Sequence, residues 1–175
     1  MVIATQNPIE QAGTYRLPGA QLDRFLIKTS RGYPDHAATV ELLAGSATRD
    51  RSAALTAVIT SAAVRDMADL AATVHTDTSV LEYIAHLTAA TREAPETRLG
   101  VSVRGALAMV RAAKVWAAAE GRNYVLPDDV LTLAPSVFTH RLVMDPEAEF
   151  SGATASAVLE TVLASTAAPQ QRVNA

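Results

Sequence analysis

The sequence predicts a mainly α-helical protein in which a bundle of about five helices follows a short α/β segment. Alanine, the strongest helix former, occurs 35 times among the 175 residues, whereas glycine and proline occur 8 times each. From residue 35 onward, apolar residues recur at every third or fourth position, which is typical of amphipathic helices. Aromatic residues make up only 5% of the chain, which disfavours a sandwich or barrel built on aromatic cross-strand pairs.

The N-terminal part of the chain predicts a strand, a turn, a short helix and a second strand. Residues 2–5 form an apolar run that predicts a buried strand leading into Asn7. Asn7 precedes a proline and therefore favours an extended or turn conformation. Pro18 suits the first position of a helix, so we expect a short helix over 19–24. Residues 25–29 predict the second strand.

Capping residues locate the helices that follow. Asp35 suits the N-cap of a helix over 36–47, and residues 48–60 remain ambiguous between helix and extended chain. Ser61 suits the N-cap of the next helix. Ser79 suits the N-cap of the helix after that, because it begins the Ser-Val-Leu-Glu pattern of a capping box.

Ser102 suits the N-cap of the longest helix, which Gly121 closes. The predicted apolar stripe of that helix consists of Val103, Leu107, Val110, Ala113 and Ala117. Further along the chain, the pattern predicts a loop over 94–101, a helix over 127–139, a loop over 145–152 and a last helix over 153–166. We therefore divide the chain into an α/β piece (1–34), a helical domain (35–167) and a tail (168–175).

Composition and charge exclude several classes of protein. The formal net charge is −3 at pH 7, with 13 arginines and 2 lysines, which gives no reason to expect a broad nucleic-acid-binding face. The absence of cysteine excludes a disulfide framework, thiol catalysis and a cysteine-based zinc site. No apolar run approaches the roughly 18 residues that span a membrane, and the first residues do not resemble a signal peptide. We expect a cytoplasmic protein whose partners are neither membranes nor nucleic acids.

Standard catalytic motifs are absent from the sequence. It contains no GxxxxGK(S/T) phosphate loop, no HExxH pattern and no GxSxG pattern. The histidines are scattered without the spacing of metal ligands. Asp128 and Asp129 favour the first turn of a helix over a metal site, because the N-terminal end of a helix attracts negative charge. We therefore expect no metal ligands in this chain.

Three polar residues occupy positions that suit a ligand as well as a structural role. Asn7 follows an apolar strand at the end where ligands bind in α/β sheets, but it also suits a turn. Arg24 ends a short helix, where the helix dipole favours a cation and where a surface arginine is also ordinary. Arg104 lies in the first turn of its helix, where the dipole disfavours a cation by about 0.3–1 kcal/mol. A local conflict of this kind is sometimes a functional site.

Several sequence blocks follow one another along nearly the whole chain. The first is Val-Ile-Ala-Thr-Gln-Asn-Pro-Ile-Glu-Gln from residue 2, and the second is Ala-Gln-Leu-Asp-Arg-Phe at 20–25. The later blocks are Thr-Arg at 91–92, Gly-Val-Ser-Val-Arg-Gly at 100–105, Gly-Arg-Asn-Tyr-Val-Leu-Pro-Asp-Asp-Val at 121–130 and His-Arg-Leu at 140–142. In order and spacing these blocks closely resemble the MoxR family of AAA+ ATPases. They resemble the ATPase subunits of magnesium chelatases more weakly.

The resemblance implies an AAA+ helical lid over 35–167, preceded over 1–34 by a short α/β remnant of the nucleotide-binding core. It implies that Asn7 is the sensor-1 residue, which positions the water that attacks the γ-phosphate. It implies that Arg24 is the arginine finger offered to the neighbouring subunit, and that Arg104 is the sensor-2 residue that contacts the nucleotide. Arginine suits these roles because its planar guanidinium binds phosphate in a bidentate way and stays charged. Such a sensor should be solvent-accessible and unpaired with carboxylates.

The resemblance also implies a function for the intact protein. It would bind and hydrolyse ATP with Mg²⁺ in a ring of identical subunits, expected to be hexameric. That ring would remodel an unidentified client protein as a chaperone or insert its cofactor. Family members carry a phosphate loop ahead of the sensor-1 strand, so we expect this chain to be the C-terminal part of such an ATPase and to be inactive alone.

Departures from the family pattern and two alternatives remain. Gly19, Val103 and Leu126 stand where the family usually has an acidic residue, a proline and a threonine. One alternative is the ATPase subunit of a metal chelatase. The other is a free-standing helical interaction module, which gives no reason for Asn7, Arg24 and Arg104 to converge in space.

Overall fold

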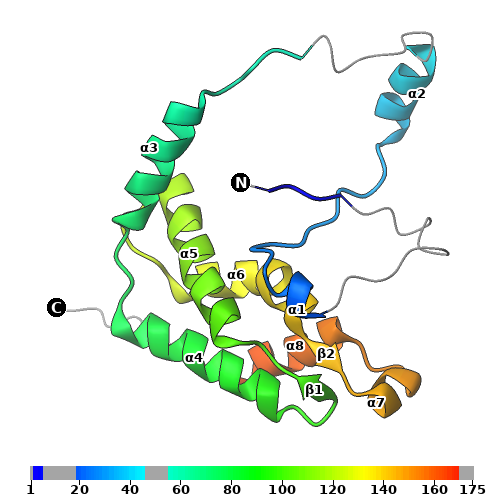
Figure 1. The fold of residues 1–175 in the computed structure, drawn as a ribbon, viewed down its shortest axis with the longest axis vertical. Helices are drawn as coiled ribbons and strands as arrows, with labels where there is room; N and C mark the ends of the chain where they lie inside the picture. The colour runs from blue at the N-terminus through cyan, green and yellow to red at the C-terminus, as the bar shows by residue number, and fades with distance from the viewer. Residues whose placement is uncertain (1, 6–18, 46–54, 170–175) are drawn as a thin grey trace.

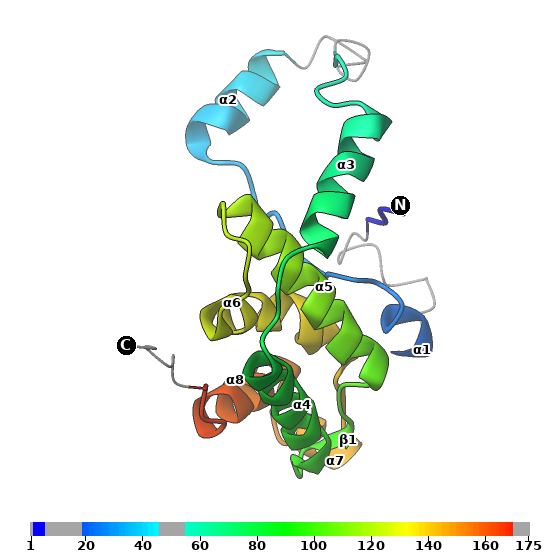
Figure 2. The ribbon, with the colours of Figure 1, turned by 90° about the vertical axis from the view of Figure 1, so that its left-hand side faces the viewer.

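The computed structural model describes residues 2–5, 19–45 and 55–169, and it shows a mainly helical protein, as predicted (Figure 1). In chain order, its elements are α1 (Gly19–Leu22), α2 (His36–Ala44), α3 (Ser61–Ala72), α4 (Thr78–Glu93), β1 (Thr97–Leu99), α5 (Val103–Ala119), α6 (Pro127–Phe138), the 3-10 helix η3 (Thr139–Arg141), β2 (Val143–Met144), α7 (Pro146–Phe150) and α8 (Ala155–Ser165). The four helices α4, α5, α6 and α8 lie together as a bundle, and α1 lies beside it (Figures 1 and 2).

The predicted caps at Asp35 and Ser102 are confirmed. The Asp35 carboxylate accepts a hydrogen bond from the N–H of Ala38 at 2.8 Å and begins α2. The Ser102 hydroxyl accepts one from the N–H of Gly105 at 3.2 Å and begins α5. In each case the side chain supplies a partner to a backbone donor that the first helical turn leaves unsatisfied.

The predicted caps at Ser61 and Ser79 are wrong. Thr60 caps α3, one residue earlier than predicted. Asp77 caps α4, and its carboxylate accepts hydrogen bonds from both the backbone N–H and the hydroxyl of Ser79. Ser79 therefore lies inside the first turn, because a carboxylate two residues earlier takes the capping role.

The hydrophobic core lies where the four bundle helices meet. Its largest buried side chains include Leu87, Met109, Phe138 and Leu159, with exposures of at most 1%. Apart from Met109, the residues that α5 buries are small, namely Gly105, Ala108, Ala112, Ala113 and Ala117. Small side chains allow neighbouring helices to approach closely, because the distance between packed helices depends on the side chains at the contact.

The apolar stripe predicted for α5 is only partly correct. Ala113 and Ala117 are fully buried, whereas Val103 and Leu107 are 69% and 55% exposed. Apolar residues occupy more than one face of this alanine-rich helix, so periodicity alone allowed two orientations. Packing selected the face with the small residues.

Helix α2 extends away from the bundle, whereas α3 reaches α5 with its C-terminal end (Figures 1 and 2). α2 has no buried residue, and α3 buries only Ala71. α3 is joined to the bundle where the Lys114 side chain of α5 donates a hydrogen bond to the carbonyl of Ala72 at 3.1 Å. The predicted helix over 36–47 ends at Ala44 among the described residues.

The two strands predicted near the N-terminus are wrong. Residues 2–5 and 25–29 form no strand, and Val2 and Ile3 are about 80% exposed. An apolar run becomes a strand only beside a partner that completes its backbone hydrogen bonds. The backbone of 25–29 is bonded to the bundle instead, since the N–H of Lys28 donates to the carbonyl of Ser136 at 2.9 Å.

Two predicted loops contain regular structure. β1, within 94–101, pairs antiparallel with β2, with Thr97 opposite Met144 and Leu99 opposite Val143. The short helix α7 lies within 145–152 and is capped by Asp145. Elements this short carry no periodic signal, so the sequence could not distinguish them from loops. Within the described residues, none of the helices has the length and hydropathy to cross a membrane.

Candidate functional site

Asp23, immediately after α1, is the centre of a polar cluster at the N-terminal end of α5. Its carboxylate accepts hydrogen bonds from the Ser102 hydroxyl at 3.0 and 3.1 Å. A guanidinium nitrogen of Arg104 lies 3.7 Å from one carboxylate oxygen, and the Nε of Arg141 lies 3.3 Å from the other. One carboxylate therefore links the N-terminal segment to both α5 and η3.

Arg104 is accessible but not unpaired. Its side chain is 60% exposed, as expected of a group that reads a ligand. The expectation that it has no carboxylate partner is wrong, because Asp23 lies within ion-pair distance. That contact is long and solvent-exposed, and exposed pairs contribute about 0–1 kcal/mol. A phosphate, with more charge and more acceptor oxygens, can replace such a partner.

Arg24 follows Asp23 directly, and its side chain is exposed. Within the described residues, its guanidinium forms no ion pair with a carboxylate. Arg104 thus contacts the carboxylate of Asp23, and Arg24 is the next residue in the chain after Asp23. Asn7 lies outside the described residues.

Arg141 is a cluster member that the sequence reasoning did not select. Its side chain is only 2% exposed, although burial disfavours a charged group and lowers the pKa of this arginine. The guanidinium donates hydrogen bonds to the carbonyls of Val137, Phe25 and Leu26. The signal that could have revealed it is the His-Arg-Leu block, which was used only as evidence of family resemblance.

His140 contacts the same segment. Its Nε2 lies 3.1 Å from the carbonyl of Phe25 and 2.9 Å from a guanidinium nitrogen of Arg141. A neutral ring satisfies one of these contacts in each tautomer, by donating to Phe25 or by accepting from Arg141. Burial lowers the pKa of His140, and the hydrogen bond to Phe25 opposes that shift only in part.

Glycine residues explain part of the Gly-Val-Ser-Val-Arg-Gly block. A Cβ at Gly105 would lie 2.8 Å from Cδ of Arg141 and 2.5 Å from Cγ1 of Val101. A Cβ at Gly100 would lie 2.6 Å from the backbone of Thr91 and Arg92. Gly100 lets the chain pass close to the end of α4, and Gly105 leaves room for the buried side chain of Arg141.

A second arginine pair lies at the opposite end of α5. Arg122 binds Asp129 through two hydrogen bonds of 2.6 and 2.8 Å, and Asp129 is only 4% exposed. The same carboxylate accepts from the N–H of Leu126 at 2.8 Å, so Asp129 is a carboxylate of the helix start, as predicted. This pair ties the loop before α6 to the helix and has a structural role.

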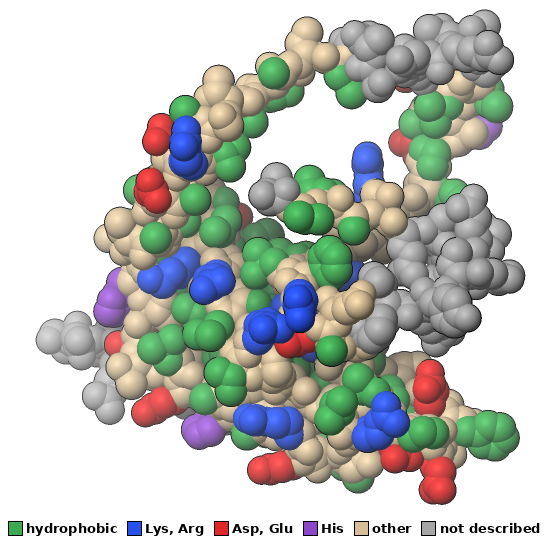
Figure 3. All heavy atoms as spheres, viewed as in Figure 1, with side chains coloured by type: hydrophobic (Ala, Val, Ile, Leu, Met, Phe, Trp, Pro, Cys, Tyr) green, Lys and Arg blue, Asp and Glu red, His purple; other side chains and the backbone are tan. Residues whose placement is uncertain are grey.

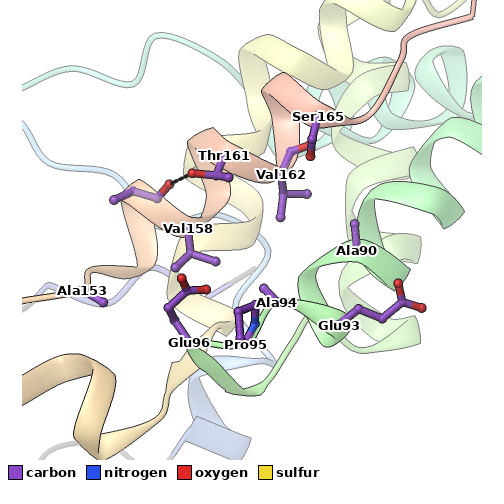
Figure 4. Close-up of a pocket in the computed structure, with 11 residues that line it drawn as sticks. Ala90, Glu93, Ala94, Pro95, Glu96, Ala153, Val158, Thr161, Val162 and Ser165 are labelled. Carbon is purple, nitrogen blue, oxygen red and sulfur yellow. Dashed lines mark hydrogen bonds between the residues drawn. The ribbon is translucent and has the colours of Figure 1, made fainter. Parts of the chain in front are cut away.

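The larger described pocket lies away from the cluster. It has a volume of about 480 Å³ and separates the C-terminal end of α4 and the turn after it from α8 (Figure 4). Glu93 and Glu96 stand on one side, and Val158 and Val162 on the other (Figure 4). Neither Arg24 nor Arg104 lines it. Among the described residues, no group of acidic or histidine side chains has the arrangement of a metal site.

The charge around the cluster favours an anion. α5 carries Arg104, Arg111 and Lys114 and has no acidic residue between Val103 and Ala119. Basic side chains predominate among the charged groups over α5 (Figure 3). The accessible guanidinium of Arg104 can bind the oxygens of a phosphate in a planar, bidentate way.

Comparison with known proteins gives two family matches along the chain. Residues 89–162 match a family model described as the AAA lid domain, and residues 1–27 match one described as the ATPase family associated with various cellular activities (AAA). The chain is 39% identical over 171 residues to the uncharacterized protein YeaC of Bacillus subtilis, covering 98% of this chain and 53% of that protein. It is 33% identical over 179 residues to Chaperone MoxR1 of Mycobacterium tuberculosis, covering 97% and 47% respectively.

A solved structure agrees. The crystal structure of a protein of Cytophaga hutchinsonii, provisionally assigned as an ATPase, superposes with a TM-score of 0.82 at 31% identity. That match covers 94% of this chain and 53% of the other. The chain spans about half the length of the curated relatives it matches.

Proposed function

Since the chain belongs to the MoxR family of AAA+ ATPases, of which it spans the C-terminal region with the AAA lid domain, we propose that it supplies the nucleotide-responsive arginines of an ATP hydrolase. Arg104 is the sensor-2 residue that contacts the phosphates, and Arg24 is the arginine finger that acts on the nucleotide of a neighbouring subunit. Asn7 is the sensor-1 residue that positions the attacking water.

The observation that carries this proposal is the exposure of the Arg104 guanidinium beside Asp23, together with the exposure of Arg24, the next residue in the chain. Arg104 is 60% exposed in the first turn of α5, where the helix dipole disfavours it, and its recorded carboxylate contact is 3.7 Å long. An arginine with only a structural role would be expected to lie in a closer pair, as Arg122 does. An interaction module without nucleotide chemistry gives no reason for this arrangement.

The residues fit the phosphates of ATP better than they fit Mg²⁺. Phosphoryl transfer requires positive charge at the γ-phosphate, which Arg24 and Arg104 can supply. Mg²⁺ prefers carboxylate and water oxygens, and the described residues offer no cluster of acidic side chains for it. We therefore assign phosphate contacts, and no metal ligands, to this part of the chain.

Arg24→Ala tests the proposal in the intact ATPase that carries this chain. A finger acts on the transition state, so kcat should fall by about 10³–10⁵-fold while nucleotide affinity changes little. Steady-state phosphate release and nucleotide titration measure the two quantities. Mixing Arg24→Ala subunits with phosphate-loop mutants should restore turnover, because each subunit supplies what the other lacks. Equal losses of kcat and affinity, without restoration, would remove Arg24 from this role.

The cellular role follows from the relatives alone. One of them is a chaperone, MoxR1. We propose that the intact protein is a cytoplasmic ring of identical subunits, hexameric in number, that uses ATP to remodel an unidentified client or insert its cofactor. The chain divides for this purpose into the core piece 1–34, the lid 35–167 and the tail 168–175.

A further inference from the structure

Arg141 makes three hydrogen bonds to one distant segment of the chain. Its guanidinium donates to the carbonyls of Phe25 at 2.5 Å, Leu26 at 3.3 Å and Asp23 at 3.4 Å. Two further contacts of the guanidinium go to the carbonyl of Val137 in α6 and to the ring of His140. A planar fork with five donors suits such a convergence of acceptors, which a lysine could not reproduce.

The Asp23 carboxylate is the charged partner of this buried guanidinium. It lies 3.3 Å from Nε of Arg141, in an ion-pair contact that lacks hydrogen-bond geometry at Nε. Arg141 is 2% exposed and Asp23 is 21% exposed, so separating the segment from the lid would leave a buried charge without its partner. The segment and the lid therefore depend on each other for charge balance.

The surrounding residues leave space for this contact. Gly105 is the position of α5 where a Cβ would meet the Arg141 side chain at 2.8 Å. Beyond the cluster, the N–H of Lys28 donates to the carbonyl of Ser136 at 2.9 Å, so the segment is bonded to α6 as well. These contacts fix the backbone on both sides of Arg24.

We propose that Arg141 is a positioning residue that fastens the segment 23–28 to the lid and thereby sets Arg24 relative to Arg104. Arg24 lies between Asp23 and Phe25, and both of their carbonyls accept from Arg141. Arg104 contacts the Asp23 carboxylate from α5, at 3.7 Å. We call the contacts between Arg141 and residues 23–28 the latch. Its effect on catalysis rests on the proposed function, whereas its existence rests on the contacts alone.

Hydrogen exchange at the Lys28 amide tests the latch in the 175-residue chain without any nucleotide. Arg141→Lys keeps the charge but removes the fork, so the Lys28 amide should exchange at least about tenfold faster while the amides of α4 stay protected. The matched control is Arg122→Lys, which loses the same fork at Asp129, far from the segment, and should leave Lys28 unchanged. An unchanged Lys28 amide in folded Arg141→Lys would overturn the proposal.

A second variant covers the case in which Arg141→Lys does not fold. Gly105→Ala displaces the Arg141 side chain and should also accelerate exchange at Lys28; an unchanged rate there would likewise overturn the latch. In the intact ATPase, Arg141→Lys should lower kcat more than nucleotide affinity, and Arg122→Lys should not. Faster Lys28 exchange with unchanged kcat would refute the positioning role. If the intact protein had no ATPase activity, the proposed function would fail, but the exchange result would still decide the latch.

Discussion

At the scale of single residues, two carboxylates neutralise lid arginines in different surroundings. Asp129 is 4% exposed and satisfies Arg122 and a backbone N–H, whereas the Asp23 side chain is 21% exposed and is shared by several donors. Removing the partner of a buried pair leaves an uncompensated charge and an unsatisfied donor. The cost therefore depends on how completely solvent can replace the lost carboxylate.

Asp129→Ala should reduce the free energy of unfolding by about 3–5 kcal/mol, because it breaks the bidentate pair and removes the acceptor of the Leu126 N–H at the start of α6. Urea denaturation followed by circular dichroism measures this change. The control is Asp128→Ala, one residue earlier and exposed, which should stay within about 0.5 kcal/mol of the unmodified chain. Similar effects of the two substitutions would show that the Arg122 pair contributes nothing specific.

His140 gives the stability of the chain a pH dependence. Its pKa is lowered in the folded state from the ordinary value of 6.5, mainly by burial. The unfolded chain therefore binds more protons once the pH falls below about 6.5, and folding becomes less favourable there. The stability contributed by the neutral ring is complete above that pH and is lost as the pH falls through the lowered pKa. Arg141 and Lys28 lower this pKa further, whereas Asp23 raises it.

His140→Gln should therefore flatten the loss of stability between about pH 7 and pH 5. Glutamine can still donate to the carbonyl of Phe25, so the segment keeps that contact while the titrating ring is removed. Denaturation midpoints across this pH range provide the measurement. His86→Gln is the control, because His86 is exposed and should leave the slope unchanged. An identical slope for His140→Gln would assign the pH dependence to other groups.

At the scale of elements, the start of α5 combines a helix cap with an attachment point. The Ser102 hydroxyl accepts from Gly105 and donates to Asp23. Thr154 caps α8 in the same way, through a 3.2 Å bond from Ala157, and no hydrogen bond of its side chain to a distant described residue is recorded. Comparing substitutions at these two caps therefore distinguishes the stability due to local capping from the stability due to attachment of the N-terminal segment.

Ser102→Ala should cost about 1–2 kcal/mol of unfolding free energy, the upper part of the range for a lost cap. Thr154→Ala should cost about 0.5–1 kcal/mol, because it removes only the local bond. Thermal and urea denaturation of both variants supply the comparison. Equal costs would mean that the hydroxyl bond to Asp23 adds no net stability.

The accuracy of the sequence predictions also varies by element. Helices with strong local signals were predicted, including α5 from Ser102 and α6 from Pro127. The strands over 2–5 and 25–29 were not found, because a strand depends on a partner that no local pattern encodes. Arg24 and Arg104 were selected through motif resemblance. Arg141 was missed, because an arginine looks exposed in any local reading and only the tertiary contacts reveal its burial.

At the scale of the whole molecule, the bundle contains the hydrophobic core, and α2 extends beyond it. Asn7, Arg24 and Arg104 come from both sequence regions that the family models match separately. None of the 175 residues forms a GxxxxGK(S/T) phosphate loop. Arginines can stabilise charge on a phosphate, but they cannot replace the backbone cradle that binds it.

We therefore predict that the 175-residue chain alone does not hydrolyse ATP. Phosphate release by the purified chain should equal that of a buffer control. The same assay on the Asn7→Ala variant detects contamination, because the activity of a contaminating ATPase would not change with this substitution. Activity above the control that Asn7→Ala abolishes would show that the chain binds and turns over nucleotide without a phosphate loop.

The small residues buried by α5 limit which substitutions this helix can tolerate. Where a helix meets its neighbours through alanine and glycine, little side-chain volume can be removed, and an added methyl group forces neighbouring side chains or backbone to shift. Substitution by a larger residue is therefore the main change that the packing disfavours at four buried positions, namely Ala108, Ala112, Ala113 and Ala117. We therefore expect substitutions to be tolerated at Val103, Leu107 and Val115, which are more than half exposed. The face of α5 that can diverge between relatives is thus the one that also carries Arg104.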